Sequence, residues 1–152
     1  MKKNLSIGEI DQALRWSRQA GLSTKGFFMV GFPNESESSL AATRELARRL
    51  PLDDISVMQL TPFPGSQLYA VAAEYGEFDR DWRKMNALNT VFVPRGMTGA
   101  SLDAAAARML REFYLRPKVL AKKLVEAAAS PRRALMMLKG GLALVKAVAF
   151  RK

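Results

Sequence analysis

Two motifs contain the residues of this chain whose types and spacing could bind a ligand. One runs from Gly26 to Glu35 and the other from Leu60 to Tyr69, and each has glycine and proline directly after a short apolar stretch. Such a stretch predicts a buried strand, and ligands bind at the carboxyl ends of parallel strands, where backbone amides and helix N-termini converge. The two motifs are therefore a candidate site for a flat ligand, built from backbone groups and Phe63. Taken singly, each motif is more typical of an ordinary turn between strand and helix.

The composition excludes several kinds of chemistry. The 152 residues contain Cys 0 and His 0. This chain therefore has neither thiolate nor imidazole with which to hold a metal ion or an iron–sulfur cluster. Catalytic pairs that join Ser or Cys to His are excluded for the same reason. We assign no catalytic residue and no metal ligand to it.

The charge of the chain is concentrated at one end. Residues 108–152 contain half of the 24 basic residues but only two of the 14 acidic ones, so the net charge of +10 lies there. This pattern predicts an anionic partner for that segment. The start of the chain lacks the apolar core of a signal peptide, so we expect a cytoplasmic location.

The elements that must position the two motifs alternate between helix and strand. Ser6 is predicted to cap the first helix and Gly21 to end it. Ser36 or a neighbouring serine is predicted to cap the second helix, and Ser66 the third. The expected helices after the first are residues 37–50 and 67–75, and the expected strands are residues 25–30 and 55–60. This order implies parallel strands joined by crossovers. The run at 25–30 does not alternate, as expected of a strand buried on both faces.

The rest of the chain is predicted to be irregular and then helical. A short strand is expected near residues 90–93. Further helices are expected at residues 102–115, 118–129 and 131–150, with breaks at Pro117 and Pro131. Two strands make too small a sheet to stand alone, so we expect these elements to be part of a larger sheet or barrel.

Taken together, the motifs resemble the radical SAM superfamily, in particular the group that often carries an N-terminal cobalamin-binding domain. The resemblance covers most of residues 6–120. It rests on residues 20–22, 26–36, 50–54, 61–66, 81–82, 85–86, 91–96 and 113–117.

The resemblance implies an α/β fold that is the C-terminal part of a partial (β/α)6 barrel, followed by a helical basic tail. Residues 1–76 would be the C-terminal half of the barrel, with its fifth strand at 26–31 and its sixth at 55–60. Residues 77–100 would be an irregular connecting segment, and residues 101–152 a helical basic extension.

The resemblance also implies a partial site for S-adenosylmethionine, on the adenosine side. The residues carried over by position are Val30, Gly31, Phe32, Pro33, Gln59, Leu60, Thr61 and Phe63. In the family's fifth-strand motif, the glutamate follows the position of Gly31 at a fixed spacing. Glu35 lies one residue later than that spacing, so the resemblance gives it no specific role.

The three-cysteine motif of the family has no counterpart in this chain. We therefore expect a C-terminal fragment of a radical SAM enzyme, inactive alone, whose full-length relative would perform methyl transfer or related radical chemistry. An iron–sulfur cluster, and cobalamin in such a relative, would belong to the full-length form. The partner would be the missing N-terminal half of the barrel, in cis or as a separate chain.

The alternative is a non-catalytic interaction module. In residues 131–152, Arg132, Lys139 and Lys146 are seven apart within an apolar sequence too short and too charged to span a bilayer. Such a helix suits peripheral binding to an anionic membrane or to a partner subunit. Packing of this helix against the rest of an enzyme is the favoured interpretation. Nucleic acid is not an expected partner, because few aromatic residues lie among the basic ones.

Overall fold

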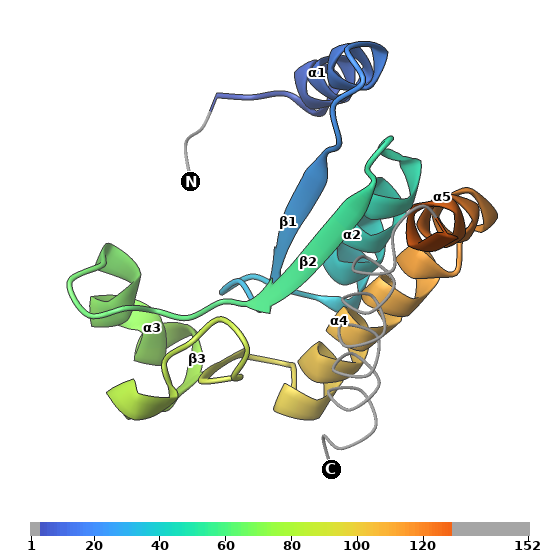
Figure 1. Cartoon of the computed structure of the whole chain (residues 1–152). Coiled ribbons are helices and arrows are strands. Elements are labelled where there is room, and N and C mark those ends of the chain that lie inside the picture. The colour runs from blue at the N-terminus through green and yellow to red at the C-terminus, as the bar shows by residue number, and fades with distance from the viewer. Residues whose placement is uncertain (1–3, 129–152) are drawn as a thin grey trace. The chain divides into compact units, whose positions relative to one another are not determined.

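The computed structural model describes residues 4–128 of the chain. Within this range the protein is a mixed α/β structure with five α-helices and two small sheets (Figure 1). Its internal contacts divide the chain into two compact units, Met1–Leu110 and Arg111–Lys152. The domain boundaries expected at residues 76 and 100 stay predictions, as does the partial barrel.

A parallel pair of strands forms the centre of the first unit. β1 (Lys25–Val30) pairs with β2 (Asp54–Gln59), with Lys25 opposite Asp54 and Val30 opposite Gln59 (Figure 1). The Leu60 amide donates to the Val30 carbonyl at 2.8 Å and extends the ladder by one residue. The two strands and their parallel pairing are confirmed.

The first two helices begin at the predicted caps. α1 (Ile7–Gln19) starts after Ser6, whose hydroxyl accepts from the Glu9 amide, while the Glu9 carboxylate accepts from the Ser6 amide. α2 (Glu37–Arg49) starts after Ser36 in the same reciprocal way, with Ser39 in place of the glutamate. These side chains satisfy amides that have no partner within the helix.

Two apolar clusters hold the first unit together. In one, Val30 and Leu40 pack with Leu102 and Ala106 of α4 (Gly99–Tyr114). In the other, Leu60 packs with Ala72 of α3 (Gln67–Tyr75) and with Phe92. The ends of β1 and β2 therefore lie between a layer formed by α2 and α4 and a second cluster built on α3.

The segment predicted to be irregular contains a second sheet. β3 (Gly76–Phe78) pairs antiparallel with β4 (Phe92–Pro94), and a short 3-10 helix, Trp82–Lys84, lies between them. Gly76 ends α3 as predicted, but β3 was not predicted. A Cβ at Gly76 would lie 2.0 Å from the Val93 carbonyl oxygen, so the close approach of the two strands requires glycine here.

The prediction that β1 is buried on both faces is wrong. Phe27 keeps 69% of its surface exposed, and Lys25 beside it is also exposed. Successive side chains of a strand point to opposite faces, and the α2–α4 layer takes only the face that carries Val30. Lys25 instead forms an ion pair with Asp54 across the strands at 3.3 Å.

The last described element of the second unit is α5 (Pro117–Ala128). It begins at Pro117, where a break between two helices was predicted. The Arg116 guanidinium lies 3.9 Å from the centre of the Phe113 ring, and its Nε donates to the Phe113 carbonyl. The expected helix at 131–150, with Arg132, Lys139 and Lys146, lies outside the described residues. Within residues 4–128 we find no helix that is long and apolar enough to cross a membrane.

Candidate functional site

The loop after β1 is closed by a carboxylate from its far end. Gly31 donates its amide to Glu35 Oε2 at 3.1 Å, and the Ser39 hydroxyl donates to Glu35 Oε1. The Glu35 amide donates back to the Phe32 carbonyl at 2.8 Å. Glu35 thus ties the end of the strand to the first turn of α2. In this compact loop Phe32 lies 42% exposed and Pro33 is half-buried.

Gly31 is required at the start of this loop by its backbone conformation. Its φ is +90°, in the region that side chains with a Cβ rarely adopt. A Cβ at this position would lie 3.5 Å from Leu102 Cδ1 and 3.9 Å from Gln59 Oε1. The backbone at the end of β1 therefore lies close against α4 and β2, which fixes where the loop begins.

The loop after β2 is fixed at both ends. At its start, the Thr61 hydroxyl donates to the Asn86 carbonyl at 3.1 Å, and Pro62 is fully buried. At its end, the Ser66 hydroxyl donates to the Phe63 carbonyl at 2.7 Å and accepts from the Tyr69 amide as the cap of α3. Phe63 lies between these anchors with 52% of its surface exposed. The loop therefore presents an aromatic ring from a constrained backbone.

Gln59 is held by a residue that the sequence interpretation did not single out. Gln59 is 4% exposed, and its Nε2 donates to Asp103 Oδ1 at 3.0 Å. The Thr90 hydroxyl donates to the same oxygen, also at 3.0 Å. Asp103 therefore joins the end of β2, the connecting segment and α4. Its one signal in the sequence is a carboxylate directly after Leu102 in an otherwise Leu- and Ala-rich segment.

The side-chain oxygen of Gln59 has no hydrogen-bond partner among the described residues. Its Oε1 is buried and points toward the region of Gly31. A carboxylate can only accept, so the bond to Asp103 identifies the amide nitrogen and leaves the oxygen on the other side. The Gln59 side chain thus serves the packing of the strand ends and faces away from solvent.

The eight predicted site residues divide into two groups. The side chains of Val30 and Leu60 lie in the two apolar clusters, and those of Gln59 and Thr61 hydrogen-bond within the protein. Those of Phe32 and Phe63 are exposed, with Gly31 and Pro33 shaping the first loop. The structure brings Val30, Gly31, Gln59 and Leu60 together at the end of the sheet. The surface available to a ligand therefore consists of two aromatic rings and loop backbone.

Charged groups with shifted pKa values lie outside the two loops. The pKa of Asp79 is lowered mainly by the hydrogen bond from Lys84, whose Nζ is 2.7 Å from its carboxylate. The pKa of Asp81 is lowered in the same way by Arg83. Both ion pairs lie within the turn between β3 and β4 and stabilise its conformation. Within residues 4–128, no group of three or more His, Cys, Asp or Glu residues could hold a metal ion.

No protein-family model matches the chain, but several curated proteins do. An uncharacterized methyltransferase of Pyrococcus horikoshii is 32% identical over 126 residues, which are 82% of this chain and 27% of the relative. The anaerobic magnesium-protoporphyrin IX monomethyl ester cyclase of Cereibacter sphaeroides is 26% identical over 114 residues, 75% of this chain and 18% of the cyclase. The bacteriochlorophyllide d C-12(1)-methyltransferase of Chlorobaculum tepidum is 27% identical over 93 residues, 61% of this chain and 20% of that enzyme.

This chain thus spans about a quarter or less of the length of the curated relatives that it matches: 27%, 18% and 20% for these three. The matched part includes most of the present sequence in the first two cases. The relatives of this chain are methyltransferases and an ester cyclase.

Proposed function

We propose that this chain supplies part of the S-adenosylmethionine-binding surface of a methyltransferase of the radical SAM superfamily. It would do so as the C-terminal part of a partial (β/α)6 barrel, in the manner of the group that carries a cobalamin-binding domain. The observation that carries the proposal is the pair of exposed rings, Phe32 and Phe63, on loops that follow two adjacent parallel strands. The methyltransferases among the relatives support it.

The residues present fit the adenosine part of this cofactor. S-adenosylmethionine supplies an activated methyl group and carries a flat adenine ring, which aromatic side chains bind by stacking. Phe32 and Phe63 are exposed for such a contact, while Glu35 and Ser66 hold their loops in shape. The other predicted side chains would contribute to cofactor binding mainly by positioning the backbone at the strand ends. These are Val30, Gln59, Leu60 and Thr61.

The residues of this chain do not fit an iron–sulfur cluster. Its ligands are Cys thiolates and, in some clusters, His, and the sequence has neither. A cluster would therefore be held by residues outside this chain, and we propose that any cobalamin would be bound there too. We propose that these residues come from the remainder of the barrel, either in cis or as a separate subunit. In support, β1 pairs only with β2 among the described residues, and α1 has no buried residue.

The test of cofactor binding is a titration of the isotopically labelled chain with S-adenosylmethionine, followed by amide NMR. We expect shift changes at residues 30–33 and 59–63, and the same changes with adenosine alone. Phe63→Ala should weaken the response. Trp16→Ala, which removes an exposed ring of α1, should leave it unchanged. Changes confined to other residues, or none at saturating ligand, would exclude the proposed site.

The test of the partner is affinity purification of the chain from its native cells under anaerobic conditions. We expect it to co-purify with a polypeptide that contains closely spaced cysteines, or to occur as part of a longer polypeptide that contains them. The absorbance of an iron–sulfur cluster should follow that polypeptide. A chain reconstituted alone that develops this absorbance would contradict the proposal.

A further inference from the structure

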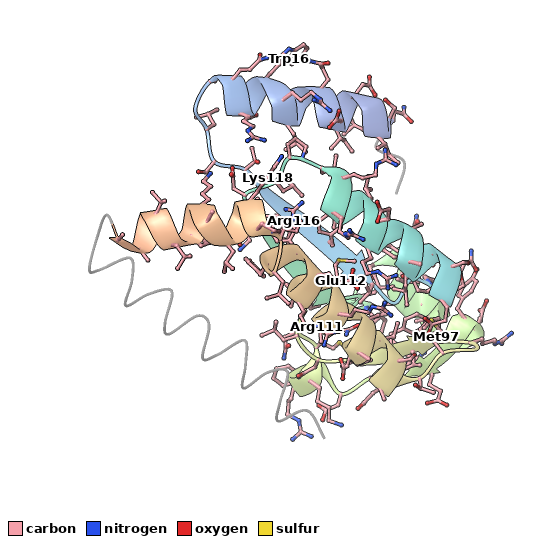
Figure 2. All side chains as sticks on the ribbon, turned by 90° about the vertical axis from the view of Figure 1, so that its right-hand side faces the viewer. Trp16, Met97, Arg111, Glu112, Arg116 and Lys118 are labelled. Carbon is pink, nitrogen blue, oxygen red and sulfur yellow. The ribbon has the colours of Figure 1, made fainter. Side chains whose placement is uncertain are left out.

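One face of α5 presents apolar side chains to solvent. Leu120 and Leu124 are one turn apart and are 47% and 63% exposed, and Val125 is 69% exposed. Val119, on another side of the helix, is buried at 6%. α5, which Lys118 marks near its start in Figure 2, therefore has one side on which Val119 is buried and another on which three apolar side chains are exposed.

Lysines border this second face on both sides. At 3.6 residues per turn, Leu120, Leu124, Ala128, Ala121 and Val125 fall within an arc of about 140°. Lys118 and Lys122 share a row beyond one border of the arc, and Lys123 lies beyond the other. An apolar arc between lysines is typical of a helix that lies in a membrane interface, because the long lysine stems follow the apolar surface while their charges reach the headgroups.

The charge around α5 selects an anionic surface. The whole net charge of +10 belongs to residues 108–152, and residues 115–125 contain no acidic residue. Each basic residue near an anionic leaflet contributes roughly 1 kcal/mol of attraction. The 12 described residues of α5 are fewer than the roughly 20 that a helix needs to span a bilayer. The helix is long enough to lie in the plane of the headgroups.

We infer that α5 is a docking helix for an anionic lipid surface, with the row from Leu120 to Ala128 inserted among the acyl chains. The inference concerns a region outside the two loops and does not depend on cofactor binding. It places the contact within the described residues, ahead of the basic segment at 131–152. A soluble acidic protein would complement the positive charge of this region but would not cover the wide apolar arc.

The absence of cysteine makes the insertion directly measurable. Leu124→Cys introduces a unique thiol that can carry a polarity-sensitive fluorophore, and Leu88→Cys provides a matched control at an exposed leucine outside α5. With vesicles of two parts phosphatidylcholine to one part phosphatidylglycerol, we expect a blue shift at position 124 and none at 88. Nitroxide-labelled lipids should quench the fluorophore at 124 alone. A label at 124 that stays in a polar environment on bound vesicles would overturn the inference.

Two further variants separate the apolar and ionic contributions. Leu120→Ser with Leu124→Ser keeps the charge and should lower the vesicle partition coefficient roughly tenfold or more. Lys118→Glu should lower it by roughly tenfold, whereas Arg95→Glu makes the same change of charge at an exposed residue of the first unit and should have little effect.

Circular dichroism of the double serine variant verifies that it folds. The labelled Leu124→Cys chain tests the same contact while Leu120 is retained. Equal binding to vesicles of phosphatidylcholine alone would overturn the inference. So would binding that the double serine variant retains in full, or binding to an acidic polypeptide but to no vesicle.

Discussion

Gln59 and Asp103 lie 44 positions apart in the chain and are joined by a 3.0 Å hydrogen bond from Nε2 to Oδ1. Because the same carboxylate oxygen accepts from Thr90, one side chain of α4 holds both the end of β2 and the segment that leads to β4. The loop that carries Phe63 begins directly after this junction. The geometry of the candidate site therefore depends on a residue that does not face it.

Asp103→Ala should destabilise the protein. It would leave the buried Gln59 amide and the Thr90 hydroxyl without their acceptor, at a cost of about 2 kcal/mol. Asp103→Asn retains one acceptor oxygen and should cost less. The free energy of unfolding from urea titrations measures both effects. Glu74→Ala, at an exposed position of α3, should change it by less than about 0.5 kcal/mol. Equal values for Asp103→Ala and Glu74→Ala would mean that the junction is not important for stability.

Gly76→Ala should disrupt the pairing of β3 with β4. The added Cβ would meet the Val93 carbonyl oxygen at 2.0 Å, and backbone atoms cannot move aside as a flexible side chain can. We expect a loss of about 3 kcal/mol of unfolding free energy. The matched control is Gly8→Ala in α1, where a Cβ would make only an ordinary contact, 3.9 Å from Ser6 Oγ, and alanine favours the helix. That substitution should be neutral or slightly stabilising. A Gly76→Ala protein as stable as the parent would disprove the close approach.

The start of α1 should loosen in acid. Hydrogen bonds from the backbone amide and the hydroxyl of Ser6 lower the pKa of Glu9 below its usual value of 4.5. Since the folded form favours the carboxylate, its contribution is complete above the unfolded pKa and is lost as the pH falls through the lowered folded pKa. An NMR titration should show the Glu9 carboxyl and the Ser6 amide titrating together below pH 4.5. In Glu9→Gln the Ser6 amide should no longer follow this transition.

The isolated chain should self-associate. β1 has one partner strand among the described residues, and Phe27 is exposed on its uncovered face. An open strand edge beside an exposed aromatic ring favours pairing between molecules. Light scattering during size-exclusion chromatography should show a mass that rises with concentration. Phe27→Lys should reduce this rise, and Trp16→Lys, at an exposed ring of α1, should not. A monomer with a sharply cooperative melt would contradict this prediction.

Local sequence signals predicted the local elements of this protein. The cap at Ser6, the turn at Gly21 and the break before Pro117 each depend on residues within one or two turns of the chain, and the structure has all three. The composition likewise excluded thiolate and imidazole ligands before any fold was known. The resemblance identified the strand ends that carry the candidate site, and its eight residues stay a prediction.

Only the tertiary structure decided which side of each element is covered. Phe27 and Val30 belong to one apolar run, yet one is exposed and the other is fully buried because α2 and α4 cover a single face of the sheet. α4 also supplies Asp103, which accepts a hydrogen bond from the Gln59 side chain. The pairing of β3 with β4 depends on Gly76 meeting Val93 across an intervening turn. Contacts between residues this far apart leave no periodic pattern in the sequence, because the residues next to one partner do not indicate which distant residue it will contact.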